Sequence, residues 1–349
     1  MKERREFDQE KELQRWKGFF SIWTTPEPEV GQTPRIAVWK KNKATLWYYP
    51  SPNKKYAVPL FLVYSLVNKA FVLDMAPGAS MIESYLKNGY DVYLMDFGSP
   101  GYEDKDITID DYLMDYIDRA VRKALKHSKA AELTVAGFCL GGTLAALYVS
   151  VSEQPIRNLI ICVAPLNFSE PPIFDKWAEA MRKGDFSMDP VLDALGFIPG
   201  KFMKYGLRLA SAPIYISPYL SLLNKAYDKD YVDRWRRFNK WTNEQVGFSG
   251  AAIKQLANEM GKKNKFMEGT LVIRGKKADP ANIQANLLVV AGEKDRLVPE
   301  TLSQDFINKV SSPDKTYRLV SGGHTTVAVR GEGLPPFLAD WLPSRSDKL

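Results

Sequence analysis

The sequence predicts an α/β fold in which a mostly parallel sheet has helices on both faces. From position 59 onward, short apolar runs alternate with amphipathic helical patterns. This alternation is typical of parallel strands that are joined by crossover helices and buried on both faces. The runs expected to form strands are 60–64, 91–95, 133–136, 159–163, 287–291 and 317–320.

Further elements are expected around this sheet. Runs 35–39 and 44–49 are rich in β-forming residues and lead into turn residues at 50–54, which predicts an antiparallel leading part of the sheet. Ahead of the strand at 133, apolar residues recur at helical spacing from Tyr112 to Leu125, behind a Thr108 cap. We expect this helix to pack against the sheet.

The N-terminal 20 residues have the pattern of a helix. It would place Leu13, Trp16 and Phe20 on one side of a heavily charged surface. We expect this helix to dock onto the body of the protein. Contact with a partner or with a hydrophobic surface is the alternative.

The regular alternation stops between about 169 and 265, where prolines interrupt helical pieces rich in Trp, Tyr and Phe. We interpret this stretch as a cap, or lid, inserted into the sheet fold. A second helical domain with no role at the active site is the alternative. The expected organisation is an N-terminal helical segment at 1–30, an α/β core at 31–168 and 266–349, and the cap at 169–265.

Composition limits the classes of function. A formal charge of +7 over 349 residues suits an acidic partner or a phosphate-bearing substrate, but no nucleic-acid motif accompanies the scattered basic residues, so no nucleic acid is expected. No apolar run reaches the ~18 residues of a transmembrane segment, and the charged residues 1–14 do not form a secretory signal. We therefore expect a cytoplasmic protein.

The chain has only two cysteines, which is too few for a disulfide framework or a cysteine-rich zinc site, and no metal is expected. Cys162 lies inside an apolar strand and is expected to be a packing residue. Cys139 instead stands between a strand and a helix-forming run, with Gly137 and Gly141 on either side. Strand, tight turn and helix around G-x-C-x-G predict a nucleophile elbow with cysteine in place of serine. A small buried cysteine at a tight turn is the alternative.

A cysteine nucleophile needs a base, and the chain has only two histidines. His127 ends an amphipathic helix and is expected to be a solvated helix-end residue. His324 follows the strand at 317–320 in a glycine-rich loop, where this kind of fold presents its catalytic base. The alternative for His324 is a loop histidine held only by hydrogen bonds.

The third catalytic residue is expected between the nucleophile and the histidine, after a strand. Asp295 fits this position, and its carboxylate would orient the imidazole and stabilise the cationic form. Glu293 is a close rival on position, Asp279 and Asp305 are weaker candidates, and a solvated loop carboxylate is the alternative for Asp295.

The oxyanion of an acyl-transfer intermediate also needs N–H donors. The fold normally supplies one from the residue after the nucleophile and one from the loop after an early strand. The backbone N–H groups expected in this role are those of Leu140 and Val67.

Together these residues resemble the catalytic subunit of the polyhydroxyalkanoate synthases, which have the α/β-hydrolase fold. The resemblance is strongest to the short forms that work with a second, smaller subunit, and it runs from about 59 to 342. It rests on positions 59–60, 67–69, 73–74, 89–96 and 98–100, the elbow around Cys139, positions 164–166 and 168, 293–299, and 323–324.

The resemblance implies an acyltransferase that polymerises (R)-3-hydroxyacyl-CoA into a polyester such as polyhydroxybutyrate (PHB) and releases coenzyme A. Cys139 would carry the growing chain as a thioester, His324 would activate the thiol, and Asp295 would help to activate the 3-hydroxyl of the incoming unit. The coenzyme A thioester is the substrate, so no cofactor is expected. The implied partners are a small synthase subunit and the surface of a polyester granule in the cytoplasm. Whether two copies form a homodimer is left open.

The sequence departs from the family pattern at four positions. Phe97 stands where the family usually has tryptophan, Asn167 stands where it has aspartate, and Thr325 and Thr326 follow the histidine. These departures bear on the range of substrates.

Two other functions stay open. A cysteine-dependent esterase or thioesterase of the same fold would let water resolve the thioester. A non-catalytic paralogue would bind granules or a synthase subunit. The complete set of Cys139, Asp295 and His324 speaks against the paralogue, because a scaffold does not need all three at active-site positions.

Overall fold

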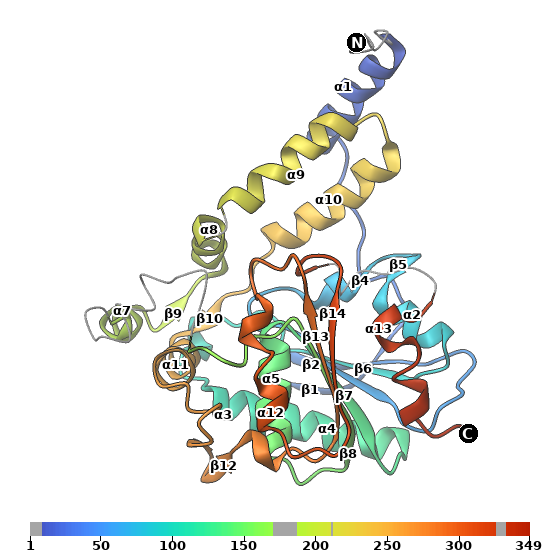
Figure 1. Ribbon diagram of the computed structural model, residues 1–349. Helices are drawn as coiled ribbons and strands as arrows, with labels where there is room; N and C mark the ends of the chain where they lie inside the picture. Colours follow the sequence, from blue (N-terminus) through green and yellow to red (C-terminus); the bar gives the residue numbers. More distant parts are fainter. Residues whose placement is uncertain (1–8, 170–186, 211, 326–332) are drawn as a thin grey trace, which may run out of the picture.

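The computed structural model describes residues 9–169, 187–210, 212–325 and 333–349. Its centre is an eight-stranded sheet of order β1-β2-β6-β3-β7-β8-β13-β14 (Figure 1). Strand β2 runs antiparallel to both of its neighbours, β1 and β6, and the six strands from β6 to β14 run parallel to one another. The strands are β1 (Ile36–Lys41), β2 (Ala44–Tyr49), β3 (Leu60–Val63), β6 (Val92–Asp96), β7 (Leu133–Phe138), β8 (Ile156–Cys162), β13 (Asn286–Gly292) and β14 (Lys315–Val320). The predicted fold class is confirmed, and the strand ends move by a few residues.

Successive residues of the central strands face two different cores. Leu60 and Leu62 face the core under α2 (Met81–Lys87) and α13 (Pro336–Ala339). Phe61 and Val63 face the core under α5 (Leu140–Val151) and the helical run 109–128. Because both faces are buried, the strands are apolar throughout rather than alternating.

The predicted helix behind Thr108 is a continuous helical run made of α3 (Ile109–Asp111), η3 (Tyr112–Ile117) and α4 (Asp118–Ser128). Thr108 and Asp111 form a capping box. The Asp111 N–H donates to the Thr108 hydroxyl at 3.2 Å, and the Thr108 N–H donates to the Asp111 carboxylate at 2.8 Å.

Between β8 and β13 the chain leaves the sheet and forms a mainly helical segment. Its described elements are α7 (Asp189–Leu195), β9 (Phe197–Ile198), α8 (Gly200–Ala210), α9 (Ala212–Lys225), α10 (Lys229–Asn243), β10 (Phe248–Ser249), α11 (Gly250–Gln255), η4 (Leu256–Lys262), β11 (Leu271–Ile273), β12 (Lys276–Ala278) and η5 (Pro280–Asn282). Pro171 and Pro172 of the expected cap lie outside the described residues. The shorter elements elsewhere are η1 (Ala70–Leu73), β4 (Asp74–Ala76), β5 (Ala79–Ser80), η2 (Tyr102–Asp104), η6 (Glu300–Leu302), α12 (Phe306–Lys309) and η7 (Pro343–Arg345).

Three helices project away from the sheet (Figure 1). They are α1 (Gln9–Thr24), α9 and α10, and we call them the arm. Residues Phe19 and Ile22 of α1 pack on a small core of Leu222, Ala226, Val232 and Trp235. The N-terminal helix therefore docks onto the helical insertion rather than onto the sheet. It begins at Gln9 within the described residues and continues to Thr24, past the expected end at 20.

The base of the arm is fixed to the loop that follows β3. The Trp241 indole N–H donates to the Lys69 carbonyl at 3.0 Å, and the Val246 N–H donates to the Val67 carbonyl at 2.9 Å. An isolated bridge pairs Asn68 with Gln245. Within the described residues, no helix is long and apolar enough to cross a membrane.

We predict that Gly141→Ala lowers the free energy of unfolding by about 1–3 kcal/mol. A Cβ at position 141 would lie 2.3 Å from the Val63 carbonyl oxygen, where α5 meets β3. The matched control is Gly206→Ala in α8, because a Cβ there meets nothing within 4 Å and alanine should add up to ~1 kcal/mol of helix stability. Urea denaturation measures both variants, and equal stabilities would contradict this close approach.

Candidate active site

Cys139 lies at the turn between β7 and α5, with φ 53° and ψ −133°. A left-handed backbone costs a non-glycine residue roughly 1–3 kcal/mol, so the surrounding packing must hold it. The neighbouring glycines make this packing possible. A Cβ at Gly137 would lie 2.5 Å from the Cα of Gly142. The Cys139 N–H also donates to the Cys162 carbonyl at 3.0 Å, which ties the turn to β8.

The thiol of Cys139 is partly exposed at the N-terminal end of α5. The Gly142 N–H already donates to the Cys139 carbonyl at 2.8 Å. Leu140 is the first residue of the helix, so its N–H has no intrahelical acceptor. A helix N-terminus favours negative charge, and this end of α5 lies beside the sulfur of Cys139.

Asp295 lies in the loop after β13, and its side chain is fully buried. One carboxylate oxygen accepts the N–H groups of Leu297 and Val298, both at 2.9 Å. The other oxygen lies 2.8 Å from Nδ1 of His324. The carboxylate is thus held by its own loop and directed at the imidazole.

His324 lies in the loop after β14, and backbone hydrogen bonds join this loop to that of Asp295. The Glu293 N–H donates to the Val320 carbonyl at 3.0 Å, and the Lys294 N–H donates to the Gly322 carbonyl at 2.9 Å. Because Asp295 engages Nδ1, Nε2 remains for the hydrogen bond that the imidazole forms with Cys139.

The charge state of His324 follows from these contacts. Burial alone would lower the pKa of His324. The negative charge of Cys139 and the hydrogen bonds with Asp295 and Cys139 act in the opposite direction and raise the pKa to about 10. The imidazole is therefore held as an imidazolium at neutral pH.

The structure brings Cys139, Asp295 and His324 together, and it places the other histidine elsewhere. His127 is exposed at the end of α4, and its Nδ1 lies 2.7 Å from the Tyr93 hydroxyl. Cys162 is buried in β8. Burial raises the pKa of the Cys162 thiol, which keeps it protonated.

The rival acids lie away from the imidazole. The Glu293 side chain is exposed. Asp279 caps η5 through the Ala281 N–H. Asp305 accepts a hydrogen bond from the Asn167 amide at 3.3 Å.

The two expected oxyanion donors, the N–H groups of Leu140 and Val67, lie in different surroundings. The Leu140 N–H is at the start of α5, next to the thiol. The Val67 N–H makes a long contact of 3.4 Å with the Ser65 hydroxyl of its own loop. The oxyanion role of both N–H groups stays a prediction.

Tyr64 is a neighbour of the thiol that the sequence analysis missed. It directly follows β3 and is only 6% exposed. Burial and the nearby charge of Cys139 raise the pKa of Tyr64 well above its ordinary value, so the phenol stays neutral. Its position could have indicated this, because Tyr64 directly follows β3, the strand that pairs with β7.

The side chains at positions 97 and 167 both make local contacts, and those of Asn167 explain its amide. The Phe97 ring packs edge-on against Tyr112, with centroids 5.4 Å apart. Asn167 donates to Asp305, while its amide oxygen accepts a hydrogen bond from Asn264 at 2.9 Å. An aspartate at 167 would bring a second carboxylate beside Asp305, so an amide suits this site. Thr326 lies outside the described residues.

Comparisons with known proteins show what this chain is similar to. A family model described as alpha/beta hydrolase fold matches residues 59–329. The poly(3-hydroxyalkanoate) polymerase subunit PhaC of Haloferax mediterranei is 31% identical over 93% of this chain and 66% of its own length. The subunit of the same name from Allochromatium vinosum is 29% identical over 94% of each chain. A soluble variant of monoglyceride lipase from Saccharomyces cerevisiae is 15% identical over 93% of this chain and 96% of its own, with a TM-score of 0.57.

The polymerase subunits and the lipase support different conclusions. The two polymerase subunits confirm the expected family resemblance and the expected class of acyl-transferring enzyme. The lipase, at its low identity, shows the fold alone.

We predict that Asp295→Asn lowers the pKa of His324, because the hydrogen bond and the negative charge of Asp295 raise it. The asparagine oxygen can still accept the two loop N–H groups, so the loop should keep its shape. Titration by NMR measures the pKa of His324. The chain has only two histidines, so their signals are easy to assign, and His127 serves as the internal control. An unchanged pKa of His324 would contradict the coupling to Asp295.

Proposed function

Because the chain belongs to the alpha/beta hydrolase fold family, we propose that it is the catalytic subunit of a polyhydroxyalkanoate synthase. It would join (R)-3-hydroxyacyl groups from coenzyme A into a polyester and release coenzyme A. The observation that carries the proposal is a cysteine at the elbow in contact with His324, in a chain that resembles polymerase subunits over almost its whole length.

The first step loads the acyl group. The Cys139 thiolate attacks the carbonyl carbon of the acyl-CoA, and the oxyanion that forms is stabilised by the Leu140 and Val67 N–H groups. The bond from carbon to the coenzyme A sulfur then breaks, and His324 gives its proton to the departing thiolate. One thioester replaces another, so the step is close to balanced in free energy.

The second step extends the chain. The 3-hydroxyl of an incoming hydroxyacyl-CoA attacks the acyl-Cys139 thioester and gives its proton to the imidazole, which Asp295 supports. A new ester bond forms, and the bond to Sγ breaks and regenerates the thiolate. The lengthened chain is now esterified to the incoming unit, and it returns to Cys139 by another loading step.

Water must be kept away for the thioester to survive between these steps. The buried Asp295 and the loop after β3, which the insertion holds through the Val246–Val67 hydrogen bond, support such exclusion. A thiol esterase would use the same residues and let water take the place of the 3-hydroxyl.

The relatives named above are described as subunits. We infer that this chain also works with a smaller subunit and acts at the surface of the polyester granule.

We predict that the purified chain releases free thiol from (R)-3-hydroxybutyryl-CoA and forms insoluble polyester, with and without the co-expressed small subunit. Cys139→Ser should reduce thiol release by roughly 10³-fold or more, because an alkoxide is much harder to form than a thiolate. Cys162→Ala is the matched control and should keep its turnover, because Cys162 only packs in the core.

Two other outcomes would favour a different function. Thiol release with only free hydroxy acid as product would identify a thiol hydrolase. No release under either condition would favour a non-catalytic paralogue that binds granules or a synthase subunit.

A further inference from the structure

Large apolar side chains repeat along the outer face of α1. Leu13, Trp16, Phe20 and Trp23 are separated by three, four and three residues, and they are 44–65% exposed. We call them the α1 seam. Trp16 stacks on Phe20 at 5.9 Å, so the seam is continuous. This spacing is that of the a and d positions of a coiled coil, which pack against a second helix.

The opposite face of α1 is already in use. Phe19 and Ile22 pack on the core of the arm. At Gly18 an added Cβ would lie 1.8 Å from the Ala226 carbonyl oxygen, so the helix approaches the turn between α9 and α10 very closely. This contact fixes the rotation of α1 and leaves the seam facing outward.

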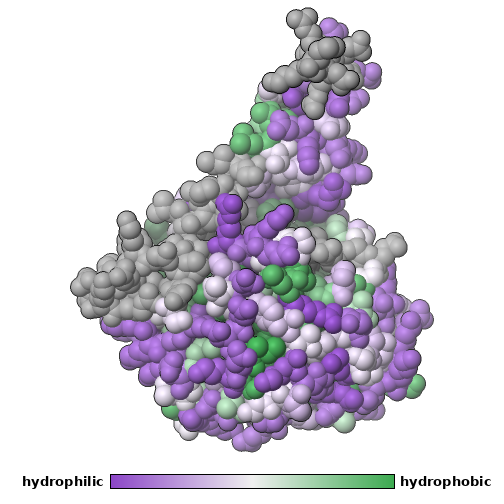
Figure 2. All heavy atoms as spheres, in the orientation of Figure 1, coloured by the Kyte–Doolittle hydropathy of each residue, from purple (hydrophilic) through white to green (hydrophobic). Residues whose placement is uncertain are grey.

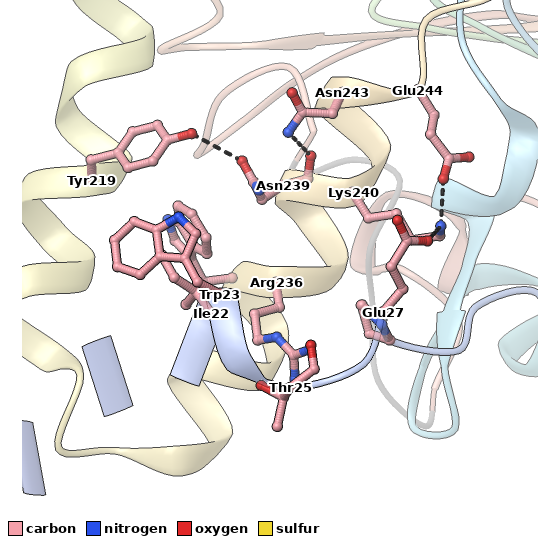
Figure 3. A pocket seen from close by; sticks show the side chains of 12 residues that line it. Ile22, Trp23, Thr25, Glu27, Tyr219, Arg236, Asn239, Lys240, Asn243 and Glu244 are labelled. Atoms are coloured by element: carbon pink, nitrogen blue, oxygen red, sulfur yellow. Dashed lines mark hydrogen bonds and ion pairs between the residues drawn. The ribbon is translucent and has the colours of Figure 1, made fainter. Parts of the chain in front are cut away.

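A pocket of about 360 Å³ continues the seam towards the base of the arm. Figure 3 shows Trp23 and Ile22 from α1, Tyr219 from α9 and Arg236 from α10 around it. The walls are held in place, since the Tyr219 hydroxyl donates to the Asn239 amide oxygen at 3.2 Å. The pocket wall combines the aromatic rings with charged and amide side chains, and such a concave site suits a single protruding side chain.

The arm also differs from the body in charge and core size. Residues 9–24 and 212–243 contain nine Lys and Arg but only five Asp and Glu. Arg15, Arg236 and Lys240 are already ion-paired, so the other basic residues, such as Lys17, carry the positive excess. In Figure 2 hydrophobic and hydrophilic atoms lie side by side on the projecting arm. Among the described residues, its core has only four buried side chains, so further apolar burial would stabilise it.

We propose that the arm is a docking surface for an acidic amphipathic helix of another polypeptide. The apolar stripe of that helix packs along the α1 seam, one of its side chains enters the pocket, and its acidic residues face the basic arm. The identity of that polypeptide as the small synthase subunit rests on the proposed function, whereas the surface itself does not.

Two other occupants fit less well. A second copy of this chain would bring two arms with the same positive excess together, which is unfavourable. A lipid or polyester surface would favour a broad apolar face, whereas the seam is narrow and ends in a concave pocket.

The test uses the full chain and a fluorescent designed helix with Leu at the a and d positions and Glu on the flanks. Fluorescence anisotropy should give saturable binding that weakens with salt. Trp16→Ser with Phe20→Ser should weaken binding roughly tenfold or more. Lys17→Glu, a surface change beside the seam that leaves the apolar contacts in place, should weaken it roughly threefold. The matched control is Val272→Ser, an equally exposed apolar residue on β11 outside the arm.

Several results would overturn the proposal. These are no binding of the helix, equal binding by the seam variant, or tighter binding of a helix with Lys in place of Glu. Binding to phosphatidylglycerol vesicles alone would indicate a lipid surface. A dimer in light scattering that the seam variant dissociates would indicate a second copy.

Binding is measured without substrate, so it is independent of turnover. Basal thiol release by the isolated chain should be unchanged in all these variants, and circular dichroism checks their folding. If the wild-type chain binds the helix but releases no coenzyme A, the proposed function fails and the docking surface stands. If the wild-type chain releases coenzyme A but does not bind the helix, the docking surface fails and the proposed function stands.

Discussion

The left-handed turn at Cys139 is the constraint on which the site depends. The strain at φ 53° is held only because glycines at 137, 141 and 142 let α5 pack directly against β3, β7 and the exit of β8. That close packing points the N-terminus of α5 at the thiol. The loops after β13 and β14 end at the same edge of the sheet, because parallel strands bring their carboxyl ends together, and they supply Asp295 and His324.

The charges around this turn determine the protonation state of His324. Burial would favour a neutral imidazole, but Cys139 and Asp295 together raise the pKa of His324 to about 10, so the site holds an imidazolium that can donate its proton. The same edge is connected to the arm. Near the end of helix α10 the Trp241 indole donates to the Lys69 carbonyl, and the Val246 N–H just after the helix donates to the Val67 carbonyl. Hydrogen bonds therefore join the arm directly to the expected oxyanion loop.

Local patterns could predict the parts of the fold that are built from local constraints. The apolar runs gave the parallel strands, and G-x-C-x-G gave the elbow, because only glycine permits its close contacts. Long-range partners could not be predicted in this way. The amphipathic pattern of α1 does not indicate which surface the helix covers. In the structure α1 packs on helices that lie about 200 residues later in the chain. The amide at Asn167 makes sense only beside Asp305. Tyr64 resembles any core residue until its strand is placed beside β7.

The central claim is that Cys139 carries the acyl group as a thioester. Butyryl-CoA tests it most directly, because this substrate has no 3-hydroxyl and can load the enzyme without extending a chain. After brief incubation and acid quench, intact mass spectrometry should show one added butyryl group, and peptide mapping should place it on Cys139. The adduct should disappear with hydroxylamine, which cleaves thioesters. An adduct on another residue, or coenzyme A release in the Cys139→Ala variant at the wild-type rate, would contradict the account.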